Sequence, residues 1–411
     1  MSRTRTRRPR RPRRVPGIET RWRGGRWTHR VRWTDPVTGQ RRSEEFDALA
    51  DAIDFREALR RARRHGRMQD LTAGREVLRE FVAGEWWPTH ATVNLERATL
   101  IAYSSVWSKH LDPRVGHLQL REIDPGVVAK LRLAMEQDGV GAPTIVKAMT
   151  MLQSIFATAV IWGRAQTNPV AMVRKPTVTA RVVEPLSPLA VERIAAQPVL
   201  DLTGRMLIYV VSYAGLRPEE ALALRWRHVR RQTLLVEQKN VDGEILSYLK
   251  VRTKPPRSVD LLRPLLQDLA AYRLALGRPH DAAFVFARPD GGPWLAGDYR
   301  NWRRRRWQVA CDAAGLGEIR ITRLAGRARR TYEGPTPYWL RHSFASLLLH
   351  EGRLSPAELA EQLGHSIQTL LKTYSHVMAD LKGQPRVPAE QQIAEARAKL
   401  AGATAATDGQ V

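Results

Sequence analysis

The most informative helical segment of the chain reads Pro337-Tyr338-Trp339-Leu340-Arg341-His342-Ser343-Phe344-Ala345-Ser346-Leu347-Leu348. Its leucines and its phenylalanine recur at helical spacing, so we expect them to form one buried stripe along a helix. Arg341 and His342 lie near the start of that helix. The segment therefore predicts a packed helix that carries two polar side chains at its entrance.

A second segment lies upstream and reads Tyr213-Ala214-Gly215-Leu216-Arg217-Pro218-Glu219-Glu220-Ala221-Leu222-Ala223-Leu224. Proline at the first helical position places Arg217 at a helix entrance, where backbone N–H groups already favour an anion. Glu220 lies within one turn and can orient the guanidinium group. Taken alone, this pair is more often a weak surface ion pair.

Two further motifs follow downstream. Ser355, followed three residues later by Glu358, is a capping box with proline at the first helical position. We expect the helix to end at Gly364 and to leave His365 on a loop. Tyr374 comes nine residues after His365. Taken singly, His365 is more often a structural histidine and Tyr374 a packing residue.

The order of these motifs resembles the catalytic pattern of the tyrosine recombinase (phage integrase) family. The pattern consists of Gly-Leu-Arg-x-x-Glu, then Leu-Arg-His opening a helix, then Leu-Gly-His, then Tyr-x-His nine residues further on. Four matches in the same order favour this resemblance over the ordinary structural interpretation of each motif taken singly. The resemblance covers a catalytic part from about residue 185 to 382, and in layout only the helical segment before it and a basic N-terminal module.

The resemblance implies a role for each matched residue. Arg217 and Arg341 match the arginines that hold the non-bridging oxygens of the scissile phosphate, and paired guanidinium forks suit the charge that builds up there. Tyr374 matches the nucleophile, which forms a 3′-phosphotyrosine and frees a 5′-hydroxyl. His365 matches a hydrogen-bond donor to the same phosphate. One phosphodiester is exchanged for another ester, so resealing needs no ATP.

Two positions depart from the family pattern. The family usually has histidine three residues before the second arginine, where this chain has Tyr338. A neutral phenol can donate a hydrogen bond but is a poor base at pH 7. We therefore expect Tyr338 to keep the phosphate-binding role, while any general-base help comes from water or His365.

The second departure concerns the hairpin lysine that protonates the departing 5′-oxygen in the family. Lys254 is our choice because it lies just before the turn-forming Pro255-Pro256 pair. Simple spacing instead places Arg252 at the family position, and Lys250 is a third candidate. Arginine hardly deprotonates, which favours one of the lysines.

Composition agrees with a DNA-binding protein. The 411 residues include 67 Lys plus Arg against 41 Asp plus Glu, which gives a formal charge of +26. Such an excess of charge favours a polyanionic partner. Cys311 is the only cysteine, which excludes an intrachain disulfide and a zinc site with two or more thiolates. We expect no cofactor, no metal and no membrane partner, and a cytoplasmic, nucleoid-associated protein.

The sequence predicts a multidomain, mainly α-helical fold. Residues 17–33 indicate a strand, residues 40–46 a second strand after a turn at 35–39, and residues 48–65 a helix. The predicted order is a disordered basic arm at 1–16, an arm-type DNA-binding module of sheet plus helix at 17–68, an all-helical core-site-binding domain at 69–178, a mixed catalytic domain with a small β-sheet at 179–386, and a C-terminal helix and tail at 387–411. The last helix is expected over residues 389–400, with a frayed tail, and the sequence leaves open whether it packs on its own domain or on a neighbouring protomer.

Together these features predict site-specific recombination that integrates or excises a phage or mobile element. The resemblance implies double-stranded DNA attachment sites and a homotetramer on paired sites as partners, with a directionality or DNA-bending protein as a further candidate. Two alternatives stay open. One is a DNA-binding regulator with impaired catalysis, and the other is a topoisomerase-like enzyme that acts without paired sites.

Overall fold

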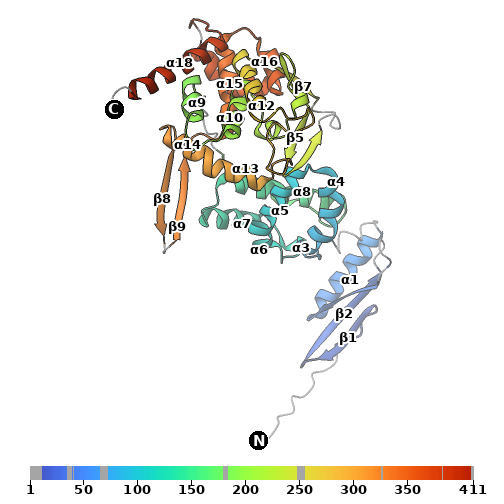
Figure 1. The fold of residues 1–411 in the computed structure, drawn as a ribbon. Coiled ribbons are helices and arrows are strands. Elements are labelled where there is room, and N and C mark those ends of the chain that lie inside the picture. Colours follow the sequence, from blue (N-terminus) through green and yellow to red (C-terminus); the bar gives the residue numbers. More distant parts are fainter. Residues whose placement is uncertain are drawn as a thin grey trace. The chain divides into compact units, whose positions relative to one another are not determined.

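The chain forms two compact units, Met1–Ala180 and Arg181–Val411. A computed structural model describes residues 12–34, 39, 41–64, 73–178, 184–247, 255–324, 327–381 and 383–408. Both units are mainly helical and carry small antiparallel sheets (Figure 1). This agrees with the predicted fold class.

The first part of unit 1 is a three-stranded antiparallel sheet with one helix against it, made of β1 (Ile18–Arg23), β2 (Arg26–Thr34), β3 (Arg41–Phe46) and α1 (Leu49–Arg64). Figure 1 shows α1 along one face of the sheet. Val31 and Leu59 are buried between sheet and helix. The Trp33 ring meets the Phe55 ring edge-on at 5.4 Å between centroids, so this tryptophan belongs to the small core.

One prediction for this module is wrong. Residues 17–33 form two strands rather than one, because the chain reverses at Gly24 and Gly25 with φ values of 55° and 81°. Glycine adopts such positive φ angles without the steric penalty of a Cβ atom. Most of the turn predicted at 35–39 lies outside the described residues.

The rest of unit 1 is helical. Its elements are α3 (Leu78–Phe81), η1 (Val82–Ala91), α4 (Thr92–Asn94), α5 (Arg97–Val106), η2 (Trp107–Leu111), α6 (Asp112–Val115), η3 (Leu120–Glu122), α7 (Pro125–Gln137), α8 (Ala142–Ile161) and η4 (Pro169–Met172). Within the described residues, α8 alone is long and apolar enough to cross a membrane. Its buried side includes Ile145, Leu152 and Phe156, which form the core of this helical part. Core packing therefore accounts for its apolar composition.

Over its described residues, unit 2 combines helices with three two-stranded sheets, β4–β7, β5–β6 and β8–β9. Its elements are α9 (Pro188–Ala195), α10 (Leu202–Ala214), α11 (Pro218–Ala221), η5 (Trp226–His228), β4 (Thr233–Val236), β5 (Gln238–Val241), β6 (Glu244–Ser247), β7 (Arg257–Asp260), α12 (Arg263–Ala275), α13 (Ala296–Trp302), η7 (Arg303–Trp307), α14 (Gln308–Ala313), β8 (Glu318–Leu324), β9 (Arg327–Glu333), α15 (Pro337–Glu351), α16 (Pro356–Leu363), α17 (Ile367–Asp380) and α18 (Ala389–Asp408). One continuous core joins helices of this unit with β4 and β7, and α10 packs against α15 within it.

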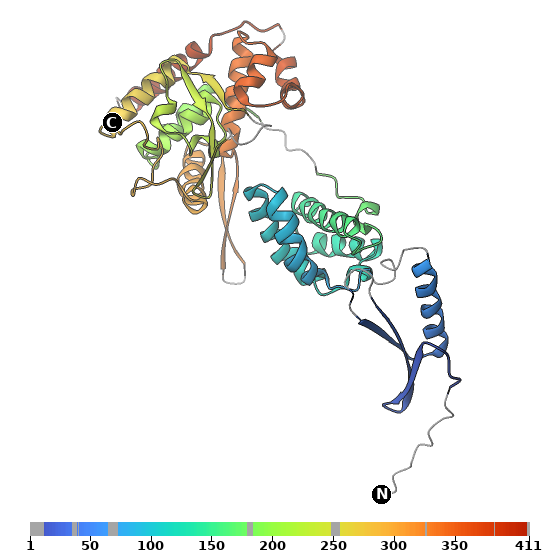
Figure 2. The ribbon, with the colours of Figure 1, turned by 90° about the vertical axis from the view of Figure 1, so that its right-hand side faces the viewer.

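The hairpin of β8 and β9 is absent from the sequence prediction. It pairs Glu318 with Glu333 at its base and Leu324 with Arg327 at its far end. Figure 2 shows it extending away from the helices of its unit. Ile321 on this hairpin is 67% exposed, whereas Tyr332 on β9 packs against the core of unit 2. Mutual pairing therefore holds the exposed part of the hairpin, and the core holds it at Tyr332.

The C-terminal helix is longer than predicted. It runs to Asp408, so the tail expected to fray from residue 401 is helical over most of its length. Ala389 and Ile393 are buried in the core of unit 2. Arg397 binds Asp268 at 2.6 Å and Glu192 at 2.9 Å. The helix thus packs on its own unit, which answers the question that the sequence left open.

Candidate active site

Arg217 stands between the end of α10 and the start of α11. Gly215 ends α10 with a φ of 62°, and Phe344 of α15 packs so closely there that a Cβ atom would collide with its ring. Glu220 accepts from the backbone N–H of Arg217 at 2.9 Å and from its Nη1 at 2.8 Å. Arg217 Nη2 also donates to the Gly364 carbonyl at 3.2 Å. The guanidinium is therefore held by two separate segments.

Glu220 organises three arginines. Its carboxylate is fully buried and accepts from Arg257 at 2.7 and 3.0 Å, from Arg217, and at 3.9 Å faces Arg341 Nη1. Burial alone would raise the pKa of Glu220, but the hydrogen bonds and charge of Arg257 and the charges of Arg217 and Arg341 outweigh it and lower the pKa to about 2. One carboxylate among three guanidinium groups leaves an excess of positive charge.

Arg341 is fully buried in the second turn of α15. Its Nη1 donates to the Gly215 carbonyl and its Nη2 to the Leu363 carbonyl. Burial, and then the neighbouring charge of Arg217, lower its pKa to about 10, which leaves it protonated at neutral pH. Its Nε has no hydrogen-bond partner among the described residues, so one buried N–H remains available to an anion.

His365 follows the glycine that ends α16, as predicted. Its Nε2 lies 3.1 Å from Arg341 Nη2. Arginine can only donate, so Nε2 must accept and the neutral imidazole carries its proton on Nδ1. Burial and the charges of Arg341 and Arg217 lower the pKa of His365 to about 3. The Nδ1 atom is buried without a partner in the described part of the chain, which makes it a second free donor.

Tyr374 lies in α17 with its side chain packed inside the unit, where the residue is only 1% exposed. Its hydroxyl is 2.8 Å from Nδ1 of His342. Burial raises the pKa of Tyr374, which the charge of Arg341 only partly offsets. Burial and then Arg341 lower the pKa of His342 to about 4, so His342 is neutral at pH 7. The site thus brings together the guanidinium groups of Arg217 and Arg341 and the His365 imidazole. It also contains the Tyr374 phenol in contact with the His342 imidazole.

The chain is similar to several recombinases, although no family model matches it. An integrase from Saccharopolyspora erythraea is 30% identical over 156 residues, which is 36% of this chain and 35% of that protein. A shufflon-specific DNA recombinase from Escherichia coli is 23% identical over 270 residues, 64% of this chain and 59% of that protein. The chain thus spans between a third and three fifths of these two relatives. Tyrosine recombinase XerC from Xanthomonas axonopodis is 26% identical, with 62% of this chain and 74% of that protein covered.

Solved structures share the fold. An integrase of the Tn1549 transposon in complex with transposon right-end DNA has a TM-score of 0.58 at 17% identity, over 75% of this chain and 97% of that one. A lambda integrase in a tetramer bound to a Holliday junction has a TM-score of 0.51 at 20% identity, over 86% and 96% of the two chains. The chain is thus similar in sequence to integrases and tyrosine recombinases and shares the fold of solved integrases.

Tyr338, the residue that departs from the tyrosine recombinase pattern, lies at the same site. Its ring meets the His342 ring edge-on at 5.3 Å between centroids. The residue is 40% exposed, unlike the buried Tyr374. Tyr338 therefore lies where its hydroxyl can reach a ligand at the surface, and its phosphate-binding role stays a prediction.

The hairpin cation cannot be assigned from the geometry. Lys250, Arg252 and Lys254 all lie in residues 248–254, outside the described residues. The described flanks are β6, which ends at Ser247, and β7, which begins at Arg257. The choice of Lys254 over its two neighbours stays a prediction.

Arg257 and His342 are site residues that sequence reasoning missed. Arg257 begins β7 and donates its Nε to the Gln362 carbonyl at 2.8 Å while it clamps Glu220. The available signal was the need of a buried glutamate for cationic partners, but the separation of 37 residues hides the pair in the sequence. His342 was visible next to Arg341, yet its contact with Tyr374 depends on how two helices pack.

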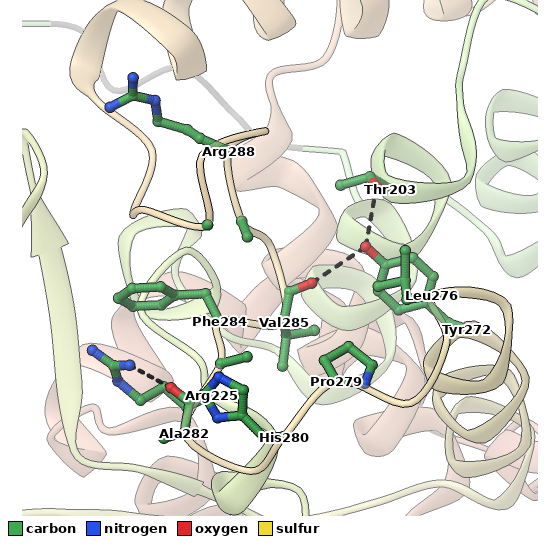
Figure 3. A pocket seen from close by; sticks show the side chains of 13 residues that line it. Thr203, Arg225, Tyr272, Leu276, Pro279, His280, Ala282, Phe284, Val285 and Arg288 are labelled. Atoms are coloured by element: carbon green, nitrogen blue, oxygen red, sulfur yellow. Dashed lines mark hydrogen bonds between the residues drawn. The ribbon is translucent and has the colours of Figure 1, made fainter.

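A pocket of about 490 Å³ lies elsewhere in unit 2 and contains none of the predicted catalytic residues. Figure 3 shows the Tyr272 hydroxyl between Thr203 Oγ1, at 3.1 Å, and the Val285 carbonyl, at 3.2 Å. Arg225 lies 4.0 Å from the centre of the Phe284 ring and donates to the Ala282 carbonyl. These internal bonds fasten a loop to α12. The predicted catalytic residues lie instead around Arg341. There the buried Arg341 Nε and His365 Nδ1 have no hydrogen-bond partner among the described residues.

Proposed function

We propose that this chain is a site-specific DNA recombinase that cuts and rejoins DNA through a 3′-phosphotyrosyl intermediate on Tyr374. The observation that carries the proposal is the gathering of Arg217, His365 and Tyr374 around the buried Arg341. An arrangement with excess positive charge and unpaired N–H donors fits a phosphodiester, whose transition state gains negative charge.

Each group has a role in this reaction. Arg217 and Arg341 bind the non-bridging oxygens of the scissile phosphate, and Glu220 keeps both guanidinium groups in place. His365 donates a hydrogen bond from Nδ1–H to the same phosphate. Tyr374 Oη attacks phosphorus and the 5′-oxygen leaves. Because the Tyr374 residue is 1% exposed, α17 has to shift as DNA is bound.

Tyr338 takes the phosphate-donor position in place of the family's histidine, and Lys254 is the proposed acid for the 5′-oxygen. If a Tyr338→Phe protein cleaved its site at the native rate, the role of Tyr338 would be withdrawn. Ester exchange conserves the bond energy, so resealing needs no ATP in this scheme.

The charge of +26 supports duplex DNA attachment sites as the substrate. We assign arm-site binding to residues 17–68, core-site binding to 69–178 and catalysis to 179–386, followed by a C-terminal helix and tail at 387–411. Integration or excision of a phage or mobile element, by four protomers on paired sites in the cytoplasm at the nucleoid, is the activity we propose. A directionality or DNA-bending protein is the further partner expected.

Trapping the covalent intermediate tests this proposal. The native protein and Tyr374→Phe are incubated without metal with nicked duplex of the element-end sequence and separated on a denaturing gel. We expect a protein–DNA band with the native protein only. A site that both proteins bind, with no band from either, would favour a DNA-binding regulator. Relaxation of supercoiled DNA without paired sites would favour a topoisomerase-like enzyme.

A further inference from the structure

The Tyr374 hydroxyl has one hydrogen-bond partner within the described part of the chain, Nδ1 of His342 at 2.8 Å. The two ring centroids are 5.4 Å apart, and both residues are at most 9% exposed. His342 follows Arg341 directly on α15, so the two side chains leave the helix about 100° apart. One side chain turns to the Leu363 carbonyl and the other to α17.

Other candidates for accepting the phenolic proton are less suitable. His365 Nε2 already accepts from Arg341 Nη2, and its other ring nitrogen carries the proton. Tyr338 offers a neutral phenol, which is a poor acceptor at pH 7. Glu220 is engaged by three guanidinium groups. His342 is the neutral imidazole that is already in contact with the nucleophile.

We propose that His342 accepts the proton of Tyr374 through Nδ1 as the phenol attacks phosphorus. This inference rests on the proposed recombinase function and adds a proton acceptor to it. The Tyr374 Oη–H bond breaks, its proton moves to Nδ1, the Oη–P bond forms and the P–O5′ bond breaks. The leaving 5′-oxygen takes its proton from a separate ammonium group or from water. Resealing runs the same steps backwards and returns the proton from Nδ1 to Oη.

The electrostatic surroundings determine when the proton moves. Arg341 and Tyr338 on α15, His365 before α17 and Tyr374 on α17 face His342. Its pKa of about 4 and the raised pKa of Tyr374 prevent transfer before attack. A phosphate bound by Arg341 offsets that arginine's charge and raises the pKa of His342. Proton transfer therefore accompanies Oη–P bond formation.

The test isolates the attack step. Native protein, His342→Asn and His342→Ala are compared in single-turnover cleavage of element-end duplex that carries sulfur in place of the bridging 5′-oxygen, since a thiolate leaves without protonation. Asparagine places an amide oxygen near the Nδ1 position, so it keeps a hydrogen-bond acceptor but cannot hold the proton. Tyr374→Phe serves as the inactive control, and site binding and thermal melting check the fold of each variant.

We expect His342→Asn to bind the site as tightly as the native protein and to cleave it about 10²-fold more slowly at pH 7. Its rate should rise with pH, while the native rate is flat above about pH 6, where a base with a pKa of about 4 is fully neutral. Added imidazole should restore part of the His342→Ala rate. The native reaction should be slower in heavy water, a result that needs no substitution.

Two outcomes separate the inference from the function on which it rests. A native adduct together with His342→Asn cleavage at the native rate, with the native pH profile, would overturn the role of His342 alone. Absence of any native adduct on a bound site would overturn the recombinase proposal and this inference with it. A native cleavage rate that is the same in heavy water would likewise contradict proton transfer to His342 during attack.

Discussion

Arginines in the two units differ in burial and in their hydrogen-bond partners. Arg341 in unit 2 is fully buried and bound to two backbone carbonyls and an imidazole. Arg32 in the N-terminal sheet has a side chain that is 63% exposed and meets one glutamate, Glu19, at 2.9 Å. Burial makes the first arginine a fixed part of a site, whereas solvent leaves the second free to exchange partners. If the proposed function holds, Arg341 should act on the cleavage rate and Arg32 on DNA affinity.

The largest expected effect comes from Arg341→Ala. The substitution removes a buried cation and leaves Glu220 with one partner fewer, which costs about 3–5 kcal/mol of unfolding free energy. Cleavage should fall by at least about 10²-fold, because an anion-binding donor is lost from the transition state. Chemical denaturation and the covalent-trapping assay measure the two effects. A variant with native stability and the native cleavage rate would contradict both the structural and the catalytic role of Arg341.

Glu220→Gln should have the next largest effect and change the pH dependence of stability. The pKa of Glu220 is lowered from 4.5 to about 2, which corresponds to about 3 kcal/mol of folding free energy. That stabilisation is fully present above pH 4.5 and is lost as the pH falls towards 2. Urea unfolding of unit 2 at several pH values should show a steeper loss in acid for the native chain than for the variant. Equal slopes would contradict the central role of this carboxylate.

Arg257→Ala compared with Arg30→Ala tests a buried pair against an exposed one. Arg257 makes charge-assisted hydrogen bonds to the fully buried Glu220, so its loss should cost about 2 kcal/mol. Arg30 meets Glu45 at 3.0 Å on the sheet surface, and its loss should not change stability measurably. Thermal melting of both variants makes the comparison. Similar shifts in melting temperature for the two variants would contradict the difference between the buried and the exposed ion pair.

The smallest expected effect on the fold comes from Arg32→Ala. Stability and the cleavage chemistry should be unchanged, because this side chain is mostly in water. If the N-terminal module contacts DNA phosphate, the slope of log affinity against log salt should fall by about 0.9. Filter binding at several salt concentrations gives the slope. An unaltered slope would show that Arg32 does not contact a DNA phosphate.

Local patterns in the sequence predict local structure well. The capping box of Ser355 and Glu358 and the stop at Gly364 are both present, since neighbouring residues alone determine them. The turn at Gly24 and Gly25 was overlooked inside an alternating run of arginine and tryptophan. The β8–β9 hairpin was missed because its arginines mask the alternating apolar positions.

Long-range contacts at the site could not be derived from spacing. Family resemblance supplied Arg217, Arg341, His365 and Tyr374, and the structure brings all four together. It could not supply Arg257 or the role of His342, because both depend on which helices and strands pack together. The residues at 248–254 stay undecided between Lys254, Lys250 and Arg252, since they lie beyond the described part of the chain.

The most direct test of the account is the identity of the residue that holds the DNA. The trapped adduct is digested with protease and nuclease, and the nucleotide-bearing peptide is sequenced by mass spectrometry. The account predicts a 3′-linked nucleotide on Tyr374, within the peptide that follows His365. A nucleotide on Tyr338 or on any other side chain, or a 5′ linkage, would contradict it.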